Sequence, residues 1–227
     1  MKIGILQTGH VADELVAENG DYPEIFARFL ENKGFVFDTY AVVDGKFPSG
    51  PEAADGWLIT GSRFGAYDDL PWIAPLEQLV RDIHASGRPM IGVCFGHQII
   101  AQALGGKVEK FDGGWSVGRH HYALNGETLA VNAWHQDQVT EVPEGAETVC
   151  STDFCEHAAL LYDQRIFTIQ PHPEIDRTYI RGLLETRAPG VVPEPLRQEA
   201  LAKLDEPNDS PRLAEIFALF FKEKRIA

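Results

Sequence analysis

The chain has few cysteines and no long apolar run, and each scarcity excludes a class of protein. Three cysteines among 227 residues are too few for a disulfide framework. No stretch approaches the roughly 20 apolar residues that cross a bilayer, and the apolar run of residues 1–6 is too short for the core of a secretory leader. We therefore expect a cytoplasmic protein without membrane contact.

Basic side chains are also scarce. The sequence has 20 lysines and arginines against 34 aspartates and glutamates, a formal net charge of −14. Such a charge repels nucleic acid and anionic lipid, so neither is an expected partner. Internal repeats and low-complexity tracts are absent. At 227 residues and 44 % hydrophobic, the chain fits a single domain, residues 1–227, that buries a sizeable core and leaves no length for a second catalytic domain.

Strands and helices alternate through the first hundred residues. The apolar spacing predicts strands at 2–7, 35–40, 57–60 and 89–93, and helices at 21–32 and 71–86. This alternation is typical of an α/β fold with a mostly parallel, doubly wound, flavodoxin-like sheet and helices on both faces. In such sheets functional groups collect at the carboxyl ends of the strands.

After residue 106 the pattern changes to short β-rich runs. They lie at 116–124, 128–133, 148–151, 159–162 and 166–170, and Asn125-Gly126 predicts a hairpin between the first two. We expect an antiparallel β extension on the edge of the main sheet. Residues 186–209 predict a proline-rich surface segment with a short helix near 196–204, and residues 210–224 a C-terminal helix with Ser210 as its cap and Pro211 at its first position.

The most informative stretch is Gly92-Val93-Cys94-Phe95-Gly96-His97-Gln98, in which a thiol lies between two glycines where an apolar run meets a helical segment. This pattern indicates a nucleophile elbow, because glycines let strand and helix approach closely while the central side chain stays accessible. The amides that open the following helix favour a thiolate and can stabilise an oxyanion. Taken alone, the pattern fits a buried structural cysteine equally well.

A second motif lies downstream, where a predicted strand at 166–170 runs into Pro171-His172-Pro173-Glu174. The prolines favour an extended backbone, in which residues two apart point to the same side. His172 and Glu174 can therefore share a face. A thiol nucleophile needs a base, and the base needs a group that fixes its orientation, so Cys94, His172 and Glu174 are the candidate catalytic residues.

With both motifs in place, the sequence resembles a class I glutamine amidotransferase domain over roughly residues 1–184, most similar to the glutaminase portion of GMP synthetase and its stand-alone relatives. The resemblance implies that Cys94 attacks the side-chain amide of glutamine with His172 as base and acid, oriented by Glu174. It implies an oxyanion hole from the backbone of Phe95 and of the Gly61-Ser62 turn. Many relatives have two glycines and a proline at this turn, whereas this chain continues Gly61-Ser62-Arg63.

The resemblance also implies a substrate-binding role for Gln98, one helical turn beyond the nucleophile, and for His135 and Asp137 in an H-x-D element. An exposed helical glutamine is the alternative for Gln98. His97 receives no catalytic role. Cys150 and Cys155 with His157 lack a second ligand pair, so we expect core packing there and neither a metal nor a cofactor.

Three functions remain open. The leading one is a glutaminase that releases ammonia for a synthetase partner. The second keeps the chemistry but cleaves larger γ-glutamyl amides in a pocket whose candidate lining residues are Arg63, Phe64, Tyr67, Trp115, Arg119, His120 and His121. The third is a non-catalytic binding subunit, which the presence of all three triad residue types disfavours.

Overall fold

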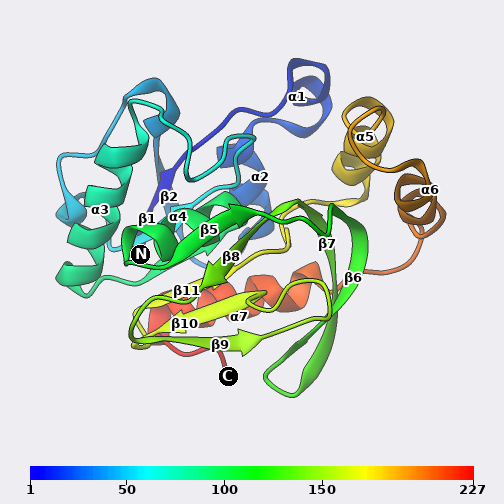
Figure 1. Cartoon of the computed structure of the whole chain (residues 1–227). Coiled ribbons are helices and arrows are strands. Elements are labelled where there is room, and N and C mark those ends of the chain that lie inside the picture. The colour runs from blue at the N-terminus through cyan, green and yellow to red at the C-terminus, as the bar shows by residue number, and fades with distance from the viewer.

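A seven-stranded sheet organises the computed structural model, which describes residues 1–227 (Figure 1). Its strand order is β2-β1-β3-β4-β11-β10-β9. The strands are β1 (Lys2–Leu6), β2 (Val36–Tyr40), β3 (Gly56–Ile59), β4 (Met90–Val93), β9 (Ala146–Cys150), β10 (Ala159–Tyr162) and β11 (Ile166–Ile169). The first five in the sheet pair in parallel, and β10 and β9 pair antiparallel at one edge. The expected parallel sheet with an antiparallel extension is confirmed.

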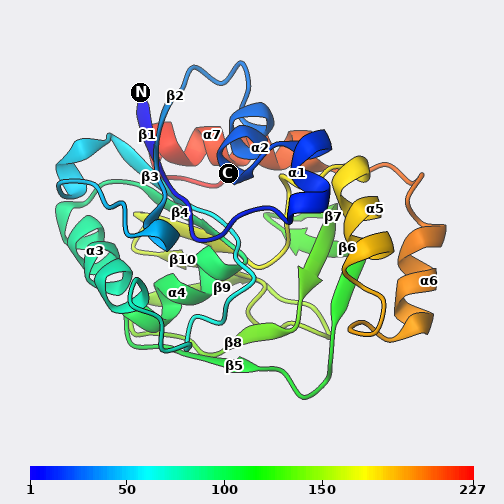
Figure 2. The ribbon, with the colours of Figure 1, turned by 90° about the horizontal axis from the view of Figure 1, so that it is seen from above.

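Helices cover both faces of this sheet (Figure 2). They are α1 (Asp13–Asn19), α2 (Tyr22–Phe29), α3 (Ile73–Ser86), α4 (Phe95–Ala103), α5 (Arg177–Thr186), α6 (Glu194–Ala202) and α7 (Ser210–Glu223), with short 3₁₀ turns η1 (Val42–Asp44) and η2 (Pro51–Ala53). Alternate residues of a strand point to opposite faces. Ile91 accordingly packs in the core cluster with α2 and α7, and Met90 in the cluster with α3 and α4. No helix is long and apolar enough to cross a membrane.

Two small sheets lie apart from the main one. β5 (Lys107–Lys110) pairs with β8 (Asp137–Glu141), and β6 (Ser116–Leu124) pairs with β7 (Glu127–His135). The expectation that the runs at 116–124 and 128–133 join the main sheet is therefore wrong. Asn125 and Gly126 have positive φ and make a tight turn, after which β6 and β7 pair with each other along nine residues. The hairpin packs on α6, where a Cβ on Gly118 would lie 2.5 Å from the Cβ of Ala200.

The C-terminal part follows its prediction with one shift. Helix α6 falls at 194–202, close to the expected 196–204. Helix α7 begins at Ser210, so Asp209 is the N-cap residue and Ser210 is not. The Asp209 carboxylate accepts a hydrogen bond from the Ala130 amide at 2.7 Å, and the Asp209 amide donates to the Ala130 carbonyl at 2.8 Å. These contacts with β7 fix the entry into α7.

Aromatic packing holds α7 on the sheet. The Phe217 ring is fully buried and meets Phe29 and Phe167 edge-on, with ring centroids 5.4 and 6.0 Å apart. We predict that Phe217→Ala lowers the free energy of unfolding by about 3–5 kcal/mol, because it removes the buried ring and leaves a cavity. Urea unfolding checks this, with Val36→Thr at a 63 % exposed position as the control expected to change stability by less than about 1 kcal/mol.

Candidate active site

Cys94 lies in a sharp turn between β4 and α4, with φ 52° and ψ −105°. A positive φ is unusual for a residue with a side chain, and two close contacts enforce it. A Cβ on Gly92 would lie 2.5 Å from the Gly96 carbonyl oxygen, and a Cβ on Gly96 would lie 2.4 Å from the Ile59 carbonyl oxygen. Strand and helix can approach this closely only with glycine at both positions. The predicted elbow geometry is present.

His172 reaches the same region from the neighbouring strand. Strand β11 pairs in parallel with β4, and the Cys94 amide donates to the Ile169 carbonyl at 2.9 Å. Beyond β11, the His172 amide donates to the Asn132 carbonyl of β7 at 2.7 Å, which fixes the segment as an isolated bridge. His172 Nδ1 and Glu174 Oε1 are 2.7 Å apart, and both side chains are buried. The two residues share a face, as the extended backbone requires.

The surroundings of His172 favour its charged form. Burial lowers the pKa of His172, but the charges of Glu174 and Cys94 together with the hydrogen bond to Glu174 raise that pKa well above its ordinary value. Because Nδ1 engages Glu174, Nε2 is the ring atom left for exchange with the thiol. The protonated form of the His172 imidazole is thus favoured at its 2.7 Å contact with Glu174.

The turn after β3 lies against this pair. A Cβ on Gly61 would lie 3.0 Å from His172 Cε1 and 3.9 Å from Cys94 Cβ. The Ser62 hydroxyl donates to the Thr8 carbonyl at 2.7 Å, and Ser62 does not have a positive φ, so serine fits here without backbone strain. The amides of Gly61 and Ser62 donate no hydrogen bond within the protein. The amide of Phe95 opens α4, where helical amides lack partners within the helix.

A cavity of about 740 Å³ contains Cys94 and His172 in its wall. Of the predicted lining residues, Arg63, Phe64 and Trp115 line it, and Trp134 joins Trp115 with their ring centroids 5.9 Å apart. The other candidates, Tyr67, Arg119, His120 and His121, are not in this wall. The Arg119 guanidinium instead donates to the Pro207 carbonyl at 2.7 Å and pairs with Glu206 at 3.1 Å. Tyr67, Arg119, His120 and His121 therefore do not form part of the pocket that holds the nucleophile.

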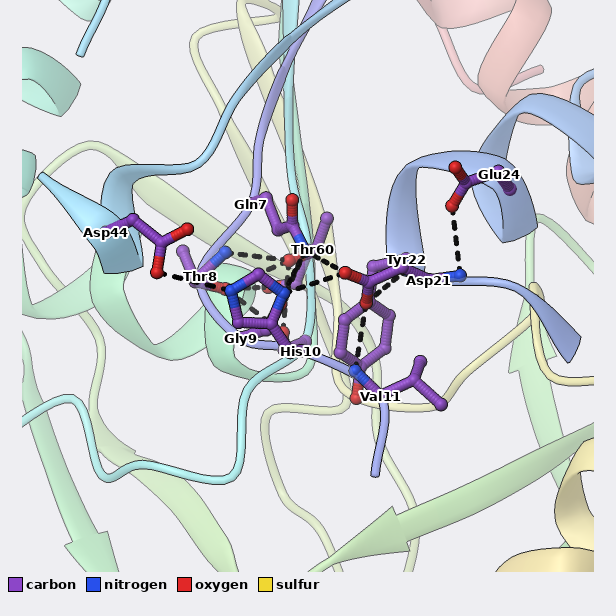
Figure 3. A network of polar contacts seen from close by, with 11 residues as sticks. Gln7, Thr8, Gly9, His10, Val11, Asp21, Tyr22, Glu24, Asp44 and Thr60 are labelled. Carbon is purple, nitrogen blue, oxygen red and sulfur yellow. Dashed lines mark hydrogen bonds and ion pairs between the residues drawn. The ribbon is translucent and has the colours of Figure 1, made fainter. Parts of the chain in front are cut away.

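The wall also contains side chains from the loops after β1 and β2 that the sequence reasoning missed. Figure 3 shows His10 between Asp21, 2.7 Å from Nδ1, and Asp44, 3.3 Å from Nε2. Gln7 donates to the same Asp21 carboxylate at 2.6 Å. His10 and Asp44 both line the cavity. Both residues follow the carboxyl ends of strands, β1 and β2, and this position in the sequence was the signal that could have predicted them as site residues.

The three residues predicted to bind substrate, Gln98, His135 and Asp137, are not in the cavity wall. The buried Gln98 amide donates to the Asp137 carbonyl at 2.9 Å and to Gln170 at 3.1 Å. Burial lowers the pKa of His135 to about 3, and its Nδ1 lies 3.3 Å from the Asp137 carbonyl oxygen. The Asp137 carboxylate accepts a hydrogen bond from Tyr67. The helical-turn argument for Gln98 fails because Cys94 is the N-cap and does not have helical φ and ψ.

The remaining cysteines lie elsewhere. Cys150 and Cys155 are buried in the core cluster beneath α7, and burial raises their pKa values to about 11 and about 12. Thiols with such pKa values stay protonated and act as small apolar side chains. His97, also buried, lies with Nδ1 2.7 Å from the Thr168 hydroxyl of β11. Cys150 and Cys155 pack in the core as expected, whereas His157 is partly exposed, with its Nδ1 2.8 Å from the Thr148 hydroxyl.

Comparison with known proteins identifies relatives of this chain. The family model for glutamine amidotransferase class-I matches residues 51–182. A glutamine amidotransferase-like protein of Schizosaccharomyces pombe is 30 % identical over 97 % of this chain and 98 % of its own length. Gamma-glutamyl peptidase 3 of Arabidopsis thaliana is 30 % identical over 73 % of this chain and 74 % of its own. GMP synthase of Bacteroides fragilis is 32 % identical over 61 % of this chain but 29 % of its own length.

Solved structures share the fold. A glutamine amidotransferase from Methylobacillus flagellatus superposes with a TM-score of 0.77 at 21 % identity, covering 99 % of this chain and 92 % of that one. The family model, which spans more than half of the sequence, and the Schizosaccharomyces pombe relative, which matches almost the whole chain, establish that the chain belongs to the class I glutamine amidotransferase family.

Proposed function

We propose that the protein hydrolyses the amide bond of a γ-glutamyl group through a thioester on Cys94, with glutamine as the leading substrate. The observation that carries this proposal is the placement of Cys94, in its strained turn, beside the buried His172–Glu174 pair in the wall of one cavity. Family membership supports the same chemistry.

The proposed reaction has two halves. The Cys94 thiolate attacks the γ-carbonyl carbon, and the C–N bond breaks as His172 Nε2 gives its proton to the leaving nitrogen. His172 then takes a proton from water, whose oxygen attacks the thioester carbon. The bond between the carbonyl carbon and the sulfur then breaks, glutamate leaves with its new carboxyl proton lost to water, and the Cys94 thiolate and the protonated His172 are restored. Glu174 holds the ring in the required tautomer and stabilises its positive charge at the 2.7 Å contact.

The negative charge that develops on the γ-carbonyl oxygen needs donors. The Phe95 amide at the start of α4 and an amide of the Gly61-Ser62 turn are the proposed donors, since the turn amides have no partner in the protein. Glutamine yields ammonia in this scheme, and a synthetase partner is its proposed recipient, as in the GMP synthase that the chain resembles in part.

Larger γ-glutamyl conjugates are the second candidate substrates. Cavities of about 300–1,000 Å³ hold ligands considerably larger than an amino acid, and this one has about 740 Å³. Several Arabidopsis thaliana relatives are named gamma-glutamyl peptidases. The third candidate, a binding subunit without activity, requires that Cys94 is inert toward a glutamine-mimicking electrophile.

We predict that Cys94→Ser lowers the release of ammonia from glutamine, or of amine from γ-glutamyl amides, by a factor on the order of 10³ or more, because the hydroxyl is a far weaker nucleophile here. Cys155→Ser, at a buried thiol outside the cavity wall, serves as the control and should retain the reaction. Undiminished turnover in the Cys94 variant would contradict the thioester mechanism.

Glu174→Gln should lower kcat by a factor on the order of 10²–10⁴, because the ring loses its orienting charge. The folded-state pKa of His172 is raised, so the imidazolium persists as pH rises and is lost only when pH passes that raised pKa. Removal of the Glu174 charge lowers this pKa, and the alkaline limb of the kcat/KM profile should move to lower pH. Glu185→Gln on the exposed side of α5 is the matched control, and an unmoved limb in Glu174→Gln would refute the pairing.

Gly61→Ala should lower kcat/KM by roughly tenfold or more with little loss of stability, because the new methyl lies 3.0 Å from His172 Cε1 and displaces the ring. Parallel measurement of turnover and of thermal unfolding checks this. Full activity in a normally folded variant would show that the turn lies farther from the reacting atoms than the structure places it.

A further inference from the structure

Arg63 differs from the other basic side chains in the cavity wall because it has no partner. Arg187 pairs with Glu14 at 3.4 Å, His10 lies between Asp21 and Asp44, and His172 engages Glu174. The Arg63 guanidinium makes neither an ion pair nor a hydrogen bond. It lies 4.9 Å from the centroid of the Phe64 ring, which also lines the cavity. Stacking on an aromatic face orients a guanidinium while leaving its donors free.

The position of Arg63 in the chain indicates that it lies on the leaving-group side of the scissile amide bond. It follows Gly61 and Ser62, and a Cβ on Gly61 would lie 3.0 Å from His172 Cε1, at the edge of the imidazole. In the proposed reaction, His172 protonates the leaving nitrogen, so the leaving group must begin at that imidazole. The turn that carries Arg63 therefore borders the leaving group.

Charge in the cavity restricts what the leaving group can carry. Asp13, Glu14 and Asp44 line the same cavity and disfavour an anion unless a cation compensates it. Glu14 and Asp44 have basic partners, and Asp13, in the first turn of α1, has none. Arg63 is the cation free to accept a new carboxylate, with a fork of donors that matches both of its oxygens.

We propose that Arg63 binds a carboxylate on the leaving group, so that among substrates larger than glutamine the protein prefers γ-glutamyl amino acids or peptides to neutral γ-glutamyl amides. This proposal rests on the proposed γ-glutamyl hydrolysis and specifies its substrate class.

The test compares γ-glutamyl-alanine with γ-glutamyl-alaninamide, which differ only in that a neutral amide replaces the leaving-group carboxylate. We expect the wild-type protein to favour γ-glutamyl-alanine in kcat/KM by about tenfold or more. Arg63→Gln should remove this preference through a rise in KM for γ-glutamyl-alanine of about 10- to 100-fold, with less than about threefold change for the alaninamide. Arg63→Lys should restore part of the preference, since it restores the charge without the fork.

Arg212→Gln is the matched control, because it removes an arginine that pairs with Glu127 outside the cavity wall, and it should leave the ratio of the two substrates unchanged. Equal losses on both substrates in Arg63→Gln would overturn the proposal, since they would place Arg63 at the glutamyl half. An absence of wild-type preference would overturn it as well. Failure of the wild-type protein to cleave any γ-glutamyl substrate would refute the proposed function itself. This outcome is distinct from the two above, in which the protein is active but does not discriminate through Arg63.

Discussion

The close approach of α4 to strands β3 and β4 is the constraint on which the site depends. Gly92 and Gly96 permit contacts that a Cβ would prohibit, and the chain between them can turn only with Cys94 at positive φ. A strained backbone conformation of this kind costs on the order of 1–3 kcal/mol and persists only where surrounding structure enforces it. Here the enforcing structure is the core on both sides of β4, where Ile91 and Met90 are fully buried.

The same strand pairing positions the histidine. The hydrogen bond from the Cys94 amide to Ile169 aligns the elbow with the end of β11, and the chain reaches His172 three residues later. From the other side, β7 holds this segment through Asn132, whose carbonyl accepts from the His172 amide and whose side chain donates to the Ile175 carbonyl at 3.0 Å. Main sheet and hairpin thus fix the segment between them. The same hairpin brings Trp134 to the cavity, which couples the position of the base to the shape of the pocket.

Local sequence was sufficient to predict the site where neighbouring residues determine the backbone conformation. Glycines around a thiol and prolines around a histidine restrict a few backbone angles, and those restrictions place Cys94, His172 and Glu174 at the carboxyl edge of the predicted sheet. The sequence was insufficient to predict structure where the contacting residues lie far apart along the chain. The pairing of β6 with β7 apart from the main sheet depends on packing against α6, and the orientation of Gln98 depends on a nucleophile outside the helical conformation.

Helices α1 and α5 were not predicted from the sequence, and the physical reasons differ. In α1 the buried side chains are Leu15 and Asn19, so the apolar face is too narrow to give a periodic hydrophobic signal. The helix packs against α5, where Gly182 lies close to the Leu15 side chain. Helix α5 does carry a readable pattern, with Asp176 capping it and buried Ile180 and Leu183 at helical spacing. The sequence of α5 alone therefore carries the signals of a helix, whereas α1 requires tertiary contact to form.

A layer of buried polar groups lies between α4 and β11, where an apolar layer would pack more simply. His97 and Gln98 of α4 bond to Thr168 and Gln170, and Glu174 Oε2, His97 Nε2 and Gln170 Nε2 make no hydrogen bond within the protein. Buried polar atoms without protein partners cost stability. They cluster behind the elbow and the His172 segment, while the apolar clusters elsewhere hold the fold. Stability and the proposed chemistry are therefore divided between regions, since the charges that raise the pKa of His172 can act strongly only where burial excludes water.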